Sequence, residues 1–102
     1  MKLKMKYTEN PWFYQKPYVK SSKTFKTVAE IKGDSADEIN DNGLIVSSAP
    51  ELMNALLAEE AYSSMAADEG DEILLGLGYK EGSKMEFIRT LRKEALKKCG
   101  IL

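Results

Sequence analysis

The amino-acid sequence predicts an α+β fold, in which an N-terminal antiparallel β-hairpin or small sheet packs on two to three C-terminal helices. Strand-like segments fill the first 32 residues, and two Ser-x-x-Glu capping patterns each precede an apolar stripe of helical spacing. The 102 residues are enough for one core. We therefore expect a single domain, 1–102, made of a basic aromatic β-hairpin at 1–32, a capped helix segment at 42–67 and a C-terminal basic helix at 83–99.

Aromatic residues and lysines are interspersed in the hairpin segment, which holds six of the nine aromatics. Trp12 to Tyr14 and Tyr18 to Lys20 suit extended strands, and Ser21 to Lys23 suits a turn. Thr24 to Lys32 alternates and predicts a half-buried strand. One face of this strand is expected to carry Phe25, Thr27, Ala29 and Ile31, and the other Lys26, Val28, Glu30 and Lys32. Pro17 is expected to interrupt the middle strand, so a small meander fits as well as a hairpin.

The middle of the chain contains the first capping pattern. Gly33 to Asp41 has no apolar period and predicts a loop or a frayed helical turn, and Asn42 to Ser47 predicts a short helix. Ser48 and Glu51 match a capping box, with Pro50 in the first helical turn. The helix that follows is expected to end near Asp68. Its expected buried stripe is Leu52, Met53, Leu56, Leu57, Ala61 and Met65.

The C-terminal segment contains the second capping pattern. Glu72 to Tyr79 predicts a short helical turn that its glycines weaken. Ser83 and Glu86 then open a helix that Gly100 ends. Its expected buried stripe is Phe87, Ile88, Leu91, Ala95 and Leu96, and arginines and lysines occupy its outer face.

Charge is segregated along the chain. Residues 1–32 carry a net +6, residues 33–79 carry −11 with no basic residue, and residues 80–102 carry +4. Such blocks either pair with one another inside the fold or present charged faces to a partner. Opposite blocks and exposed aromatics also favour self-association, so a homo-oligomer is expected.

Composition narrows the function classes. No apolar run approaches the ~20 residues of a membrane span, and no signal-peptide pattern follows the basic start, so we expect a cytoplasmic protein without membrane contact. Cys99 is the single cysteine and there is no histidine, which removes the usual zinc sites and His-assisted nucleophiles. Glu59 and Glu60 are adjacent in the sequence, so they point to different helix faces and cannot form an acid/base pair by themselves. We therefore expect a non-enzymatic protein without cofactor or metal.

The segment from Asn42 to Leu56, NGLIVSSAPELMNAL, resembles one written roughly N-A-R-L-I-A-A-A-P-E-L-L-E-A-L in many small phage and prophage proteins. Pro11-Trp12 and Val28 to Ile31 match the strands that commonly precede it, whereas Gly43 and Leu44 depart from the usual Ala-Arg. The architecture is similar to Thoeris anti-defence phage proteins, which are small, mostly oligomeric and sequester cyclic ADP-ribose-like signals. The resemblance implies a role in the cytoplasm of an infected bacterial host, and it supplies no ligand-binding motif.

The function hypothesis that follows is sequestration of a small anionic nucleotide. Aromatic faces stack bases, and arginine and lysine hold phosphates. The candidate ligand-binding residues are Trp12, Phe13, Tyr14, Tyr18, Phe25, Arg89, Arg92 and Lys93. The lysines of the hairpin are further candidates for phosphate contacts. In the plainer interpretation, Trp12 and Phe25 belong to the core, and Arg89 and Arg92 are solvated helix surface. Two alternatives remain open: an acidic face that blocks a host defence protein or nucleic-acid complex, and direct nucleic-acid binding by the hairpin.

Overall fold

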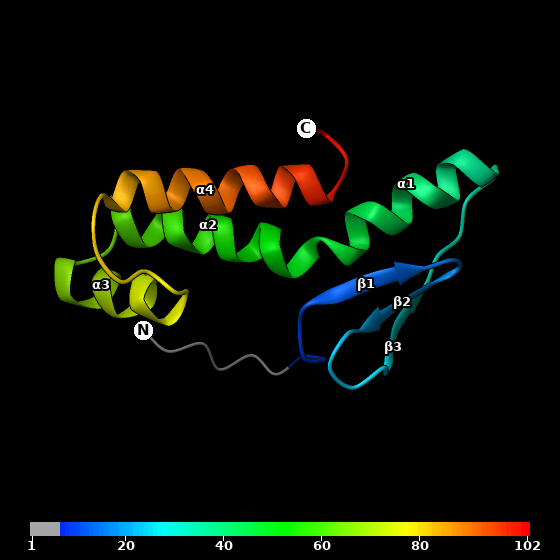
Figure 1. Ribbon diagram of the computed structural model, residues 1–102, viewed down its shortest axis with the longest axis horizontal. Coiled ribbons are helices and arrows are strands. Elements are labelled where there is room, and N and C mark those ends of the chain that lie inside the picture. Colours follow the sequence, from blue (N-terminus) through cyan, green and yellow to red (C-terminus); the bar gives the residue numbers. More distant parts are fainter. Residues whose placement is uncertain (1–6) are drawn as a thin grey trace.

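A three-stranded meander followed by four helices makes up residues 7–102, so the α+β expectation is confirmed (Figure 1). The computed structural model describes residues 7–102, and residues 1–6, which we included in the hairpin, lie outside the described residues. The elements are β1 (Trp12–Gln15), β2 (Tyr18–Ser21), β3 (Thr27–Glu30), α1 (Ala36–Ser47), α2 (Ala49–Ser63), α3 (Ala67–Gly76) and α4 (Lys84–Lys98).

The meander has the strand order β1-β2-β3, and both neighbouring pairs are antiparallel. Pro17 lies in the turn between β1 and β2, where no ladder hydrogen bond is needed from its nitrogen. The third strand is shorter than predicted. Phe25 lies outside it with a φ of 58°, because its amide donates to the Ser21 carbonyl at 2.9 Å within the β2–β3 turn. The prediction that Phe25 lies in this strand is therefore wrong.

The helix α1 begins earlier than the sequence predicted. Ser35 caps it, since its hydroxyl accepts a hydrogen bond from the Glu38 amide at 3.1 Å. Asp37 and Glu38 add negative charge at the positive end of the helix. These local interactions stabilise α1 although the segment has no apolar period. The expectation of a loop or a frayed helical turn over residues 33–41 is therefore wrong from Ala36 onward, where a regular helix begins.

Ser48 joins α1 to α2 without capping α2. The second helix starts at Ala49 with Pro50 in its first turn, as predicted. Ser48 itself is helical (φ −92°, ψ −2°), and its hydroxyl donates to the Leu44 carbonyl of α1 at 2.7 Å. Glu51 accepts a hydrogen bond from Lys98 at 2.6 Å instead. The predicted Ser48–Glu51 capping box is wrong because the preceding chain is already helical, and the two helices run end to end with a bend (Figure 1).

The predicted helix segment 42–67 is divided among three helices. α1 ends at Ser47, α2 ends at Ser63, and a new helix, α3, starts at Ala67. Asp68 and Glu69 then lie in the first turn of α3, where their charge favours the helix. The first part of the ambiguous Glu72–Tyr79 segment belongs to this helix, which ends at Gly76.

The core lies where α2 packs against α3 and α4. Its fully packed members include Ala58, Ala61, Leu74 and Ile88. The inward stripe of α2 consists of alanines, whereas Leu56 is 72% exposed. The prediction that Leu56 is buried is therefore wrong, because close approach of the helices selects the alanine face.

The C-terminal helix matches its prediction closely. The Ser83 hydroxyl accepts from the Glu86 amide at 3.2 Å, and Ile88 and Ala95 are buried. Gly100, at a φ of 89°, ends the helix, and the Ile101 amide donates back to the Leu96 carbonyl at 3.0 Å. The whole molecule is elongated, 46 × 28 × 20 Å, with the sheet and α1 at one end and α3 at the other (Figure 1).

Candidate functional site

The inner face of the sheet is occupied by α1. Tyr14 and Val19 are cross-strand partners, Val19 is fully buried, and the Tyr14 ring lies so close to Gly43 that an added Cβ would be 2.4 Å from it. Trp12 shares this face, and its indole N–H donates to the Thr8 carbonyl at 2.9 Å. Two of the predicted ligand-binding aromatics therefore make contacts within the chain: Tyr14 packs on α1, and Trp12 is hydrogen-bonded to the segment before β1.

The outer face of the sheet gathers three of the predicted aromatics. Phe13 and Tyr18 point away from α1, because each is one residue from an inward side chain. Phe25 from the β2–β3 turn meets Phe13 edge to face, with ring centroids 6.3 Å apart. Lys20 is the cross-strand partner of Phe13, and its ammonium nitrogen lies 5.7 Å from the Tyr18 ring centroid. We call Phe13, Tyr18, Lys20 and Phe25 the aromatic face.

A hydrogen-bonded turn holds Phe25 in position. The buried hydroxyl of Ser21 accepts from the Lys23 amide at 3.2 Å and from the Thr24 amide at 3.1 Å. Phe25 adopts the left-handed region that bulky residues avoid, at a φ of 58°, and yet it remains 69% exposed. The strain costs roughly 1–2 kcal/mol. Burial within the chain offsets little of that cost.

Exposed lysines lie in the two turns that connect the strands of the aromatic face. Lys16, Lys23 and Lys26 are exposed on the turns of the meander, and none of them forms an ion pair within residues 7–102. Lys32 pairs with Glu30 at 2.9 Å, and that hydrogen bond raises the pKa of Lys32. A hollow of about 450 Å³ opens beside the β2–β3 turn. It is lined by Tyr7, Thr8, Glu9, Thr24 and Lys26.

The predicted cations of α4 are not part of the aromatic face. Arg89 pairs with Glu86 of its own helix at 2.7 Å, and Arg92 pairs with Glu59 of α2. α4 meets β1 near its other end, where Lys98 donates to the Trp12 carbonyl at 2.8 Å. Arg89 precedes Lys98 by nine residues, about 13 Å along a helix. The sequence-based site is therefore divided between two regions of one chain.

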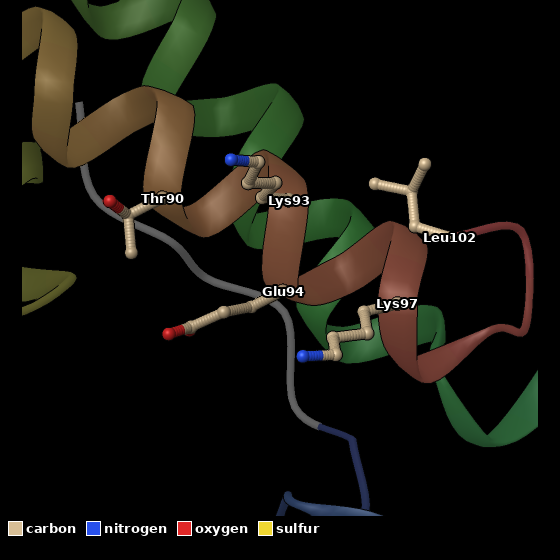
Figure 2. Close-up of a pocket in the computed structure, with 5 residues that line it drawn as sticks. All are labelled: Thr90, Lys93, Glu94, Lys97 and Leu102. Carbon is tan, nitrogen blue, oxygen red and sulfur yellow. The ribbon is translucent and has the colours of Figure 1, made fainter.

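Lys93 lines a separate, open hollow of about 410 Å³ on the outer side of α4 (Figure 2). Its other lining residues are Thr90, Glu94, Lys97 and Leu102. Figure 2 shows these side chains spread around the helix, with the Glu94 carboxylate on the same side as the Lys97 ammonium. The carboxylate offsets the positive potential there, so this hollow is a weaker candidate for an anion than the aromatic face.

Some of the oppositely charged residues in the acidic and basic blocks form ion pairs with one another inside the fold. Three ion pairs join the acidic middle block to α4: Lys84–Asp71 at 2.6 Å, Lys98–Glu51 at 2.6 Å, and Arg92–Glu59. The hydrogen bond from Lys84 to Asp71 raises the pKa of Lys84. The lysines around the aromatic face and the carboxylates of α1 remain outside these pairs.

The sequence-based hypothesis included the hairpin lysines only as a group and did not single out Lys20. It lies two positions after Tyr18 in a predicted strand, a spacing that places both side chains on one face, so the signal was present. Over residues 7–102, no three His, Cys, Asp or Glu side chains cluster so as to hold a metal ion, and no helix is long and apolar enough to cross a membrane. No family model matches the chain, and neither a curated protein nor a solved structure is significantly similar to it.

Proposed function

We propose that this protein binds an anionic nucleotide on the aromatic face and sequesters it without chemical change. The observation that carries the proposal is Phe25, a bulky residue held in a strained backbone conformation, largely exposed, and set against Phe13. Strain of this kind persists where the surroundings enforce it, and it concentrates at functional sites. A ligand ring stacked on Phe25 would supply the contact that the chain itself lacks.

The surrounding charges fit the same class of ligand. Stacking on an aromatic ring tolerates any base, and lysines supply point charges for phosphates. Lys20 lies within the aromatic face, and further exposed lysines lie in the two turns of the meander. The phosphate contacts are therefore assigned to the lysines of the meander in place of Arg89, Arg92 and Lys93.

The biological role rests on two resemblances, one of sequence and one of the order of strands and helices. The Asn42–Leu56 segment supports a phage origin, and the sheet-then-helices order supports a likeness to signal-sequestering anti-defence proteins. In that role the ligand is a cyclic ADP-ribose-like molecule or a cyclic oligonucleotide made by the host's immune system. Binding would lower its free concentration without hydrolysis.

The test is calorimetric titration of the protein with cyclic ADP-ribose isomers and cyclic oligonucleotides. One ligand is expected to bind and to be recovered intact after heat release. Phe25→Ala should weaken that binding roughly fivefold or more, since one stacked base contributes about 1–3 kcal/mol. Tyr62→Ala is the matched control, because Tyr62 is a 48% exposed aromatic on α2, away from the sheet.

Two results would contradict the proposal. If none of the cyclic ADP-ribose isomers and cyclic oligonucleotides binds, these nucleotides are excluded as ligands. Equal affinity of wild type and Phe25→Ala would place the ligand elsewhere on the molecule. Because the Phe25 side chain is largely exposed, its removal is expected to leave the fold intact, and the far-ultraviolet circular dichroism spectrum checks this.

A further inference from the structure

Helix α2 has two apolar faces, and only one of them is covered by the chain. Ala55, Ala58 and Ala61 are buried towards α3 and α4. Leu56 is 72% exposed, and Leu52 is half-buried. The leucine side of α2 therefore leaves apolar surface, chiefly at Leu56, that the chain does not cover.

The exposed leucine side continues onto α1. Ile45 is 53% exposed and precedes Leu52 by seven residues, about two helical turns. The helical conformation of Ser48 keeps the two helices end to end, with a bend between them (Figure 1). Spacings of seven and four residues place the side chains of Ile45, Leu52 and Leu56 on one side of the two helices. A groove of about 350 Å³ between β3 and α1 opens at Ile45, and Ile31 also lines it. We call Ile45, Leu52 and Leu56 the leucine strip.

Carboxylates lie at both ends of the leucine strip. Glu38 and Asp41 precede Ile45 by seven and four residues, and Glu60 follows Leu56 by four, spacings that place them on the same side of the helices. These three carboxylates form no ion pair within residues 7–102. Neither α1 nor α2 contains a lysine or an arginine. The strip is thus an apolar surface between unpaired negative charges.

Charge complementarity decides what covers this surface. We propose that the leucine strip is the docking site for an amphipathic helix of another protein, with apolar residues on one side and lysine or arginine at its flanks. Glu38 and Glu60 are 22 residues apart, roughly 33 Å along the two helices, which accommodates a partner helix of about six turns. The partner's cations would meet the unpaired carboxylates at either end.

A second copy of this chain fits the strip poorly. If two strips paired antiparallel, Glu38 and Asp41 of one copy would approach Glu60 of the other. If they paired parallel, each carboxylate would meet its own counterpart. Like charges placed opposite each other disfavour both arrangements. The leucine strip shares no residue with the aromatic face, so peptide docking and nucleotide binding are tested separately.

The probe is a synthetic 22-residue leucine–lysine amphipathic helix, titrated by calorimetry at a concentration where it is monomeric. We expect one peptide to bind per chain, with affinity falling as salt rises. A leucine–glutamate peptide with the same apolar pattern should not bind. Leu56→Gln should weaken binding tenfold or more. Leu75→Gln, which alters a 58% exposed leucine on α3, should not change it.

The charges are tested by the double variant Asp41→Asn, Glu60→Gln. It should weaken binding at low salt and flatten the salt dependence, while Asp68→Asn, Glu72→Gln on α3 is the matched control. Equal weakening by Leu56→Gln and Leu75→Gln, or no binding of the basic peptide, would overturn the proposal. So would a wild-type dimer in light scattering that Leu56→Gln dissociates, because a second copy would then cover the strip.

Discussion

Gly70 offers a test of how closely α2 and α3 pack. A Cβ at this position would lie 2.2 Å from the Ala61 carbonyl oxygen, against the 3.0 Å below which such contacts essentially never occur. Gly70→Ala therefore requires the two helices to separate locally by most of an ångström. Both atoms belong to the backbone or are fixed to it, so no side chain can rotate to relieve the contact.

The magnitude follows from two opposing effects. Overpacking of this kind costs about 1–3 kcal/mol of unfolding free energy. The higher helix propensity of alanine returns up to about 1 kcal/mol. The expected net loss is about 1–2 kcal/mol. With a urea m-value of roughly 1 kcal/mol/M, the unfolding midpoint should fall by about 1–2 M.

The same helix contains its control. Gly76 also lies in α3, and a Cβ there would meet nothing within 4 Å. Gly76→Ala should therefore raise the unfolding free energy by about 0.4–1 kcal/mol. Urea denaturation followed by circular dichroism measures both variants. If Gly70→Ala is as stable as wild type or more so, the close packing of α3 on Ala61 is not as described.

Two further predictions concern lysines. Lys98→Met removes the ammonium group that links α4 to the Trp12 carbonyl and to Glu51. Amide hydrogen exchange in β1 should therefore accelerate, and the unfolding free energy should fall by about 1 kcal/mol. Unchanged exchange in β1 would show that this contact does not hold the sheet against α4. The raised pKa of Lys84, caused first by its hydrogen bond to Asp71, makes a stabilising contribution that is present below the unfolded value of 10.5 and is lost as pH rises through the higher folded pKa. The stability difference between wild type and Lys84→Met should therefore shrink from pH 9 to pH 12, and a constant difference across that range would contradict the ion pair.

Local signals in the sequence predicted the elements they control. Ser83 caps α4 as expected, and Gly100 ends it, because a cap depends on a few neighbouring residues. The segment starting at Ser48 has the same Ser-x-x-Glu pattern, but Ser48 does not cap α2. The residues before it are already helical, and its hydroxyl donates to the Leu44 carbonyl instead. A capping motif thus predicts a helix start only where the preceding chain is not helical. Ser35 meets this condition and caps α1, although no regular apolar stripe follows it in the sequence.

The candidate site was predictable in part for the same reason. The aromatics and lysines of the meander are close in sequence, so strand alternation places Phe13 and Tyr18 on one face. Strand alternation also separates Trp12 and Tyr14 from them, which the sequence-based hypothesis did not use. The position of Phe25 was beyond such reasoning, because it depends on a turn organised by the buried Ser21 hydroxyl.

The sequence by itself determined the α+β order, the well-capped C-terminal helix and the separation of charge into three blocks. Only the tertiary structure decided which face of α2 is inside. Alanines and leucines both recur at helical spacing there, so periodicity could not choose between them. Close packing of α3 and α4 selected the small side chains, and it left Leu56, the last residue of the Asn42–Leu56 segment, facing solvent.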